Sequence, residues 1–215
     1  MRNPITLRRH GPIVAHPHAR LPDSAQALVR PIRENDAEEY ARASTRLSAE
    51  TRRRRFLNAT PRLSARELSY LTAVDQDEHV ALVAVEPGSG EILGSVRYVR
   101  IGGGRADAEL AIEVIDGWQR RGLGRALLSA VGAHALANGL TRFYALVAAD
   151  NLPMQQALKR AVVAVDSELR ELEYLLDVDA LVPAPTGRRL PAIWSRVASA
   201  AAALQHRLQP AATPA

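Results

Sequence analysis

The chain has 215 residues, which is long enough for one domain with extensions or at most two small domains. Hydrophobic residues make up 47% and charged residues 24%, as in globular proteins, so a fully disordered chain is excluded. No apolar run approaches the about 20 residues that span a bilayer, and no secretory signal is expected at the start. Cysteine is absent, which excludes disulfides, thiolate catalysis and cysteine metal sites. We therefore expect a cytoplasmic protein without a bound metal.

The charge is positive but arises almost entirely from one residue type. The formal net charge is +5, and because Lys159 is the only lysine, 27 of the 28 basic residues are arginine. A general attraction to anionic ligands follows. Only 4% of the residues are aromatic, so platforms on which bases could stack would be scarce, and no nucleic-acid partner is expected.

The first third of the chain predicts an arm, a strand and three helices. Residues 1–26 combine prolines, histidines and arginines without periodicity, which predicts a flexible N-terminal arm. A short strand is expected over 27–33, where Pro31 favours the edge of a sheet. The three helices are expected over 37–46, 48–56 and 64–72. Ser64 and Glu67 have the spacing of a capping box at the start of the third.

After the third expected helix, the spacing of apolar residues changes from the period of a helix to that of a strand. Apolar runs separated by turns predict strands over 79–85, 92–100, 107–114, 142–147 and 169–176. Leucines and valines at helical spacing predict a long helix over about 122–138 and a short one over 152–160. Helices mixed with a run of consecutive strands favour an α+β (mixed α/β) class.

The chain after the expected globular part, 27–178, has a different character. A linker rich in Pro, Gly and Arg covers 182–191, within the tail 179–215. Apolar residues then share one helical face: Leu190, Ile193, Trp194, Val197, Ala201, Leu204 and Leu208. This predicts an amphipathic C-terminal helix. Two uses stay open: docking on its own domain or a sister subunit, as in a homodimer, or binding a partner or a membrane surface.

The residues that carry chemistry follow the strand expected over 107–114. Gly122 and Gly124 lie in a turn at the start of the long helix, where unpaired N–H groups and the helix dipole attract anions. Glycine there lets a pyrophosphate approach the backbone. Three arginines add positive charge around the turn: Arg120, Arg121 and Arg125. The turn lacks the patterns of a Walker loop and of a Rossmann turn.

This segment resembles the GNAT (Gcn5-related N-acetyltransferase) superfamily. Gln119-x-x-Gly122-x-Gly124, after a strand that ends at Val114, matches that family's acetyl-CoA signature, Gln/Arg-x-x-Gly-x-Gly/Ala. Asn151 begins a stretch that matches a second family motif near the thiol end of the cofactor. The resemblance covers nearly the whole globular part and implies a central, mostly antiparallel sheet flanked by helices.

A narrower resemblance links the first third of the chain to the bacterial Pat-type protein lysine acetyltransferases. It rests on residues 47–52, 63–68 and 71–84. It implies acetyl-CoA as the co-substrate and an amine acceptor, expected to be a protein lysine, that attacks the thioester directly in a ternary complex. The resemblance also implies coenzyme contacts at Val114, Ile115, Gln119, Arg120, Arg121, Gly122, Leu123, Gly124, Arg125 and Asn151.

Two glutamates are candidates for the base that this reaction needs. An amine is mostly ammonium at neutral pH, so a base must take its proton, directly or through water. Glu109 lies where the Pat-type enzymes place their glutamate and is the expected base. Glu113 is four residues on, on the same face of the strand, and competes with it. Either carboxylate could instead be solvated or paired with an arginine. The thioester oxygen needs a backbone donor, expected near Val114.

The sequence departs from the family at two points. Leu158 stands where many members carry a tyrosine that protonates the leaving thiolate; Pat-type enzymes also tend to lack it, so solvent is expected to do this. Val162-Val163 replace the Gly-Phe that closes the preceding helix, and valine resists the left-handed cap, so this helix end should differ. The arginine run 52–55 is expected to be a solvated face rather than a contact to an acidic substrate.

Three functions therefore stay open. The first is acetylation of protein lysines, and the second is the same chemistry on a small amine. The signature does not distinguish these two because it reports only on the cofactor. The third is a GNAT-fold module that senses acyl-CoA and docks through its C-terminal helix, which the two departures keep open.

Overall fold

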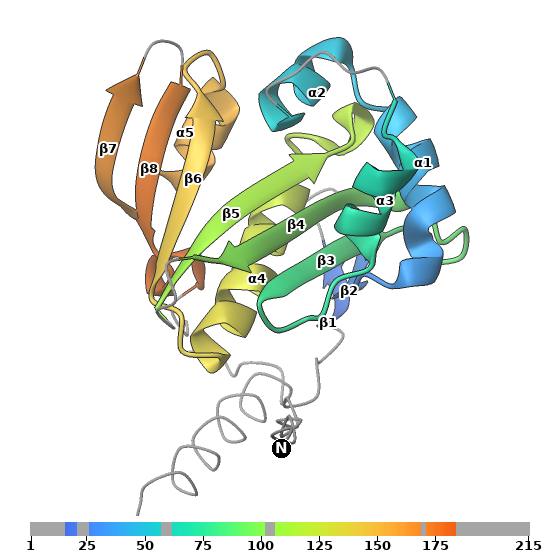
Figure 1. Cartoon of the computed structure of the whole chain (residues 1–215), viewed down its shortest axis with the longest axis horizontal. Helices are drawn as coiled ribbons and strands as arrows, with labels where there is room; N and C mark the ends of the chain where they lie inside the picture. The colour runs from blue at the N-terminus through green and yellow to red at the C-terminus, as the bar shows by residue number, and fades with distance from the viewer. Residues whose placement is uncertain (1–15, 21–25, 57–61, 102–105, 169–170, 184–215) are drawn as a thin grey trace, which may run out of the picture. The chain divides into compact units, whose positions relative to one another are not determined.

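The computed structural model describes residues 16–20, 26–56, 62–101, 106–168 and 171–183 (Figure 1). The expected amphipathic helix and most of the expected N-terminal arm lie outside these residues. Within the described part, no helix combines the length and the apolar character needed to cross a bilayer.

Eight strands form one sheet in the order β1-β2-β3-β4-β5-β6-β8-β7. The strands are β1 (His16–Arg20), β2 (Gln26–Pro31), β3 (His79–Val85), β4 (Ile92–Arg100), β5 (Asp107–Val114), β6 (Arg142–Ala148), β7 (Val162–Glu168) and β8 (Glu171–Asp177). All neighbouring strands are antiparallel except β5 and β6, which are parallel. The expected mixed class with a mostly antiparallel sheet is confirmed.

The helices pack on the two faces of this sheet (Figure 1). They are η1 (Glu34–Asp36), α1 (Ala37–Thr45), α2 (Ala49–Phe56), α3 (Ala65–Thr72), η2 (Asp116–Trp118), α4 (Leu123–Ala137), α5 (Leu152–Leu158) and η3 (Asp179–Leu181). Strand alternation divides the buried side chains between two cores. Leu82 of β3 packs in the core that contains Leu127 of α4, whereas its neighbour Val83 packs in the core that contains Tyr40 of α1.

The expected start signal of α3 is confirmed, and a glycine follows the end of α4. Ser64 and Glu67 form the reciprocal capping box at the start of α3. Gly139 follows α4 with φ +79°, a left-handed conformation that glycine adopts without steric cost.

Two strands differ from the sequence-based expectation. β1 lies within the segment expected to be an arm and pairs with β2. β7 begins at Val162, directly after the turn that follows α5, so Val162-Val163 start a strand instead of distorting a helix end. Branched side chains favour this strand, because they fit the pleated surface of a sheet. Pro31 ends β2, which is not an edge strand, but the register with β1 stops at Val29, so that edge needs no N–H from Pro31.

The parallel pair β5 and β6 is joined along only part of its length. The register pairs are Asp107–Arg142, Ala108–Phe143 and Glu109–Tyr144. Beyond Glu109 the two strands diverge, and Figure 1 shows the gap between them widening toward α2. This divergence positions the candidate site.

Candidate active site

A cleft of about 110 Å³ opens where β5 and β6 separate. Residues of α2, β5, β6 and α5 line it, among them Arg55, Glu109, Leu146, Asn151, Met154 and Leu158. Two of the expected site residues, Glu109 and Asn151, therefore lie in one cleft although they are far apart in the sequence.

The N-terminus of α4 lacks the cap that helices commonly carry. Its N-cap is Gly122, with φ +90° and no side chain to accept a hydrogen bond. The N–H of Ala126 donates to the Gly122 carbonyl at 3.1 Å, so the amides of Leu123, Gly124 and Arg125 precede the first intrahelical bond. The first turn contains no acidic residue. This end of the helix therefore presents amides and the positive end of the dipole, which suit an anion.

The turn before α4 holds Arg120 in a costly conformation. Arg120 has φ +60°, a left-handed region that costs a non-glycine residue about 1 kcal/mol or more. The guanidinium carbon of Arg121 lies 4.1 Å from the centroid of the Trp118 ring. Strain of this kind persists where the surrounding structure fixes it, and functional sites are the common place.

Hydrogen bonds join the signature turn to the start of α2. The Gln119 side-chain amide donates to the Val114 carbonyl at 3.0 Å and to the Thr51 hydroxyl at 3.2 Å. The Asp116 carboxylate accepts from the Ser48 N–H at 2.9 Å and from the Thr51 hydroxyl at 3.0 Å. Gln119 thus shapes the turn, and α2 is held beside the cleft.

Val114 and Ile115 have different backbone surroundings at the end of β5. The Ile115 N–H donates to the Leu93 carbonyl at 2.9 Å, and its carbonyl accepts from the Trp118 N–H at 2.8 Å. Successive strand residues direct their N–H groups to opposite edges, so the Val114 N–H faces the β6 side, where the cleft lies. The backbone N–H and carbonyl of Ile115 are therefore engaged within the chain, whereas the Val114 N–H stays the predicted backbone donor; the expected coenzyme contact at Ile115 remains a prediction.

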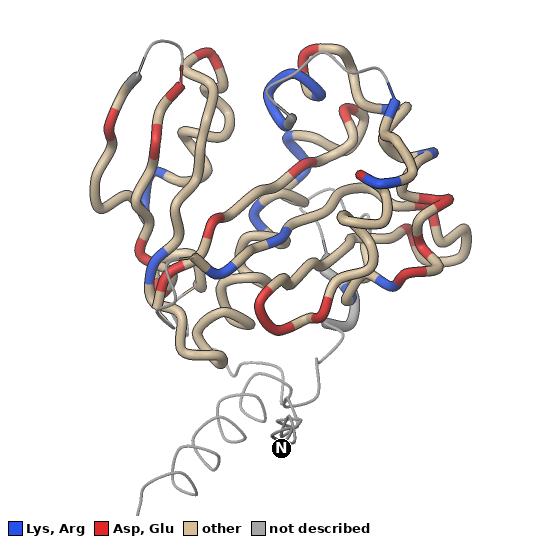
Figure 2. The backbone as a smooth tube through the Cα atoms, viewed as in Figure 1, with Lys and Arg blue, Asp and Glu red and all other residues tan. Residues whose placement is uncertain are grey.

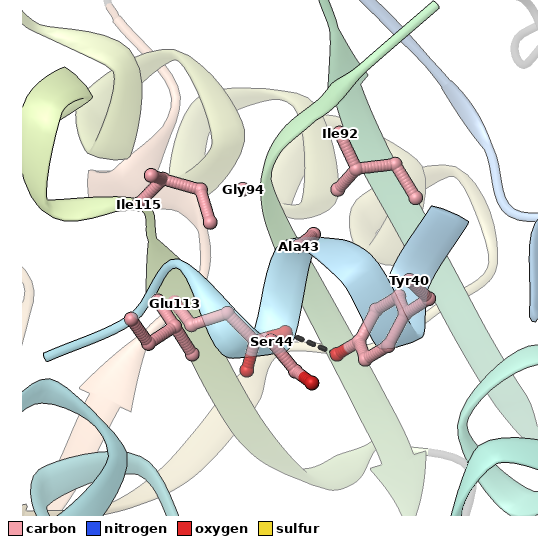
Figure 3. A pocket seen from close by; sticks show the side chains of 8 residues that line it. Tyr40, Ala43, Ser44, Ile92, Gly94, Glu113 and Ile115 are labelled. Atoms are coloured by element: carbon pink, nitrogen blue, oxygen red, sulfur yellow. Dashed lines mark hydrogen bonds between the residues drawn. The ribbon is translucent and has the colours of Figure 1, made fainter. Parts of the chain in front are cut away.

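Glu113 is buried in a network of polar side chains. Its carboxylate accepts hydrogen bonds from Tyr40, from Ser95 at 2.6 Å and from Arg55. Figure 3 shows Tyr40 and Glu113 pointing toward one another beside a cavity of about 10 Å³, roughly the space of one water molecule. Burial alone would raise the pKa of Glu113, but the charges of Arg55 and Arg97 outweigh it and the pKa is lowered. This carboxylate is ionised and its oxygens are engaged.

Arg97 and His79 extend the network under α1 and α3. Arg97 is buried and donates to the Leu71 carbonyl and to the Tyr40 hydroxyl, both at 3.2 Å. The Nε2 atom of His79 lies 3.2 Å from an Arg97 guanidinium nitrogen. Burial and the Arg97 charge lower the pKa of His79 to about 4, so its imidazole is neutral at pH 7. His79 is thus a polar partner of Arg97 inside the fold.

Glu109 has the opposite surroundings, although it shares a strand face with Glu113. Its register partner on β4 is Val99, and its side chain is exposed in the cleft. Burial lowers the pKa of Arg55, but the charge of Glu113 and, more weakly, that of Glu109 raise it overall. Arg55 therefore lies near both glutamates, and of the two only Glu109 faces the cleft.

The arginine run of α2 is engaged rather than solvated, which corrects the expectation. Arg53 and Arg54 form ion pairs with Asp150, in the turn between β6 and α5. Arg52 donates to the Leu47 carbonyl at 2.8 Å, and Arg55 pairs with Glu113. Figure 2 shows these basic residues along α2, above the end of β5 and across the gap from the end of β6. The ion pairs to Asp150 connect the two sides of the cleft.

Asn151 and Leu158 mark the two ends of α5. The Asn151 side-chain oxygen accepts from the Met154 N–H at 3.3 Å and caps the helix. Leu158, seven residues on, is buried and lines the cleft, so this position offers no hydroxyl to a leaving group. Among the described residues, no three histidine, aspartate or glutamate side chains gather as a metal site would require.

Comparison with known proteins shows the family. The model of the acetyltransferase (GNAT) domain matches residues 26–161. The chain is 34% identical over 132 residues to acetyltransferase Pat of Mycolicibacterium smegmatis, a match that covers 61% of this chain and 39% of that protein. It is 31% identical over 137 residues to acetyltransferase PA5475 of Pseudomonas aeruginosa, covering 63% and 73%.

A solved structure agrees with these matches. The GNAT domain of S. lividans PAT superposes with a TM-score of 0.70 at 33% identity, over 74% of this chain and 95% of that one. The chain therefore belongs to the GNAT N-acetyltransferase family and has its fold. It spans less than half the length of the M. smegmatis relative.

Proposed function

We propose that this chain transfers an acetyl group from acetyl-CoA to the ε-amine of a protein lysine, with Glu109 as the base. The cleft between β5 and β6, which contains one exposed carboxylate, together with the uncapped start of α4 that follows β5 in the chain, is the observation that carries this proposal. Similarity to enzymes named Pat supports the lysine acceptor.

The coenzyme end of the site fits a diphosphate. The amides of Leu123, Gly124 and Arg125 would donate to its oxygens, and the side chains of Arg120 and Arg125 would balance its charge. A Cβ added to Gly124 would meet only Val114 at 3.8 Å, an ordinary contact, so the fold itself leaves space beside this backbone. Acetyl-CoA supplies the activated acetyl thioester.

The reaction needs two groups from the chain, a hydrogen-bond donor and a base. The Val114 N–H would donate to the thioester oxygen as it gains negative charge. Glu109 would take the proton that the attacking amine loses, directly or through water. The amine nitrogen forms the new bond to the acetyl carbon while the bond to sulfur breaks. Leu158 offers no proton, so solvent protonates the thiolate.

Glu113 has a supporting role in this scheme. Its carboxylate already accepts from Tyr40, Ser95 and Arg55, so an ammonium would have to displace a buried partner to reach it. We therefore propose that Glu113 holds Arg55 and α2 in place while Glu109 does the proton transfer. Asn151 would contribute by fixing α5 at the cleft wall.

An acceptor panel tests the proposal. Purified chain and acetyl-CoA are combined with lysine-containing proteins, polyamines and antibiotic-like amines, and thiol release is followed. Release with proteins but not with polyamines supports a protein lysine acceptor. Release only with small amines moves the function to a small-molecule acetyltransferase. Calorimetric binding of acetyl-CoA without turnover on any acceptor favours an acyl-CoA-sensing module. We place this activity in the cytoplasm, on the basis of the cysteine-free sequence.

A further inference from the structure

At the edge of the sheet β7 is exposed on both faces, with Val163 63% and Val165 48% exposed, whereas β6 and β8 are covered by a helix on one face only. On that face Ala145 of β6 and Tyr174 of β8 belong to the core that α4 and α5 complete. On the other face Leu146 is 46% exposed, and Ala164 and Glu173 are exposed as well. Figure 1 shows α5 behind β6 and no described helix in front of these three strands.

Strand register makes this open face continuous with Glu109. Glu109 pairs with Tyr144, which pairs with Leu175, which in turn pairs with Ala164. Residues that pair directly across strands share a face of the sheet. The next row along the strands is Leu146, Glu173 and Asp166. A chain lying across these rows would therefore reach the cleft from the side of Glu109.

The open face combines apolar side chains with acidic ones. Four acidic residues of β7 and β8 have described side chains, Asp166, Glu171, Glu173 and Asp177, and the described residues of these strands include no basic one. This contrasts with the net charge of +5 of the whole chain and with the basic α2 across the cleft (Figure 2). Exposed carboxylates beside Leu146 and Tyr144 complement a segment that carries both basic and apolar side chains.

We propose that the acceptor polypeptide docks on this open face, which we call the acceptor face: Tyr144, Leu146, Ala164, Asp166, Glu173 and Leu175. Its lysine enters the cleft beside Glu109, a neighbouring basic residue lies against Glu173 and Asp166, and an apolar residue packs on Leu146. This inference rests on the proposed function and names its substrate class, a lysine within a basic and apolar sequence.

The spacing of the strands sets the position of the basic residue. β5 and β8 are separated by β6, so in the row of Glu109 they lie two strand spacings apart, about 10 Å, and Glu173 lies in the next row along β8. An extended peptide advances about 3.3 Å per residue, so the basic residue is about three positions from the acceptor lysine.

Charge reversal at Glu173 tests the inference with three probes. The first is a peptide with one lysine, an arginine three positions away and a leucine between them. The second replaces the arginine with glutamate, and the third is N-acetyl-lysine methylamide, which is too short to reach β8. Glu173→Lys is compared with the wild type and with Glu34→Lys, the same charge change at an exposed residue of η1. Peptide binding is measured by fluorescence anisotropy, and acetylation by kcat/KM.

The expected result is about a tenfold weaker binding of the arginine peptide by Glu173→Lys at low ionic strength, shrinking as salt is added. The ratio of kcat/KM for this peptide to that for the short amide should fall by the same factor. The affinity of Glu173→Gln for the arginine peptide should lie between those of the wild type and Glu173→Lys, and that of Glu34→Lys should match the wild type. The glutamate peptide should bind more tightly to Glu173→Lys than to the wild type.

The outcomes separate this inference from the proposed function. Acetylation of all probes with no effect of Glu173→Lys overturns the acceptor face and leaves the acetyltransferase activity standing. Charge-dependent peptide binding without acetylation supports the face and overturns the activity. Loss of a dimer in Glu173→Lys, seen by sedimentation, shows that a second copy occupies the face and overturns the inference.

Discussion

Arg55 of α2 and Glu113 of β5 form an ion pair that is almost closed off from water, with 13% and 7% of their side chains exposed. Glu113 also accepts hydrogen bonds from Tyr40 and Ser95. The pair joins α2 to the strand whose other face supports α4, so it fixes one wall of the cleft. The main role of the Glu113 carboxylate is therefore to stabilise the folded structure, rather than to act in the chemistry.

Glu113→Gln should therefore lower stability. The amide leaves the buried charges of Arg55 and Arg97 without their counter-charge, and removing one partner of a buried pair costs about 3–5 kcal/mol. Urea unfolding measures the free energy of unfolding. Glu38→Gln, in the exposed pair with Arg42 on α1, is the matched control and should change it by less than about 1 kcal/mol.

A different result would reassign Glu113. If Glu113→Gln unfolds like the wild type but loses thiol release with every acceptor, this carboxylate takes part in the chemistry, and the supporting role is wrong. The hydrophobic double variant Arg55→Met with Glu113→Leu adds a second readout. It should regain part of the lost stability, because it leaves neither charge unpaired.

Glu109→Gln should have the complementary effect. Its side chain is exposed in the cleft, so the free energy of unfolding should change by at most about 0.5 kcal/mol. Loss of a general base lowers kcat by about 10²–10⁴. Calorimetry should find the affinity for acetyl-CoA nearly unchanged. Turnover at the wild-type rate would show that another group, or solvent alone, accepts the proton.

The sequence was sufficient where local signals decide the structure. The capping box at Ser64, the glycine after α4, and the strands around residues 79–114 follow from spacing and periodicity, and the structure has them. Gly122 at the start of α4 also lies where the signature predicts, because a left-handed residue there requires glycine. These features depend on residues close in the chain.

The sequence was insufficient where contacts between residues far apart in the chain determine burial and hydrogen-bond partners. In the sequence, Arg55 is one of four consecutive arginines on an expected helix, and nothing local distinguishes it. Its burial depends on Glu113, 58 positions away. Tyr40 follows a helical apolar pattern with Ala43 and Leu47, which predicts a core residue but not a hydroxyl aimed at Glu113. Alternation placed both glutamates on one face, but it did not show which one α1 and α2 cover.

β7 was missed for a related reason. Val162-Val163 occupy the position of the helix end in the family pattern, but two branched residues after a short turn also suit a strand. Pairing with β8, nine positions later, decides between these interpretations.

Arg125→Glu should affect the stability of α4 and the affinity for coenzyme A in opposite directions. A glutamate in the first turn suits the helix dipole, so the free energy of unfolding should stay equal or rise by about 0.3–1 kcal/mol. Affinity for coenzyme A should fall by about tenfold or more, equivalent to about 1.4 kcal/mol, because a carboxylate would face the diphosphate. Calorimetry and thermal unfolding measure the two effects on one sample.

Arg66→Glu is the matched control for this substitution. Arg66 is exposed in the first turn of α3, so the change in charge and helix position is similar, but the residue is not in the signature turn. Its coenzyme affinity should equal that of the wild type. Equal losses in both variants would mean that net charge, rather than the end of α4, governs binding.

His79 should make stability depend on pH. Its pKa is about 4 in the folded chain, lowered by burial and by Arg97, against about 6.5 when unfolded. Between these values the unfolded chain binds more protons, so the free energy of unfolding is highest above about pH 6.5 and falls as the pH drops toward about 4. The groups that face the imidazole are Arg97 of β4, Tyr70 of α3 and Asp75.

Urea unfolding of the wild type and His79→Gln between about pH 4 and about pH 7 measures this dependence. Glutamine can still accept from Arg97 but does not titrate. The difference at pH 7 gives the structural effect of the substitution, and the change in that difference with pH isolates the proton. The wild type should lose stability faster than the variant on acidification. Parallel curves would show that the imidazole carries the same charge in the folded and unfolded chain, contrary to its burial beside Arg97.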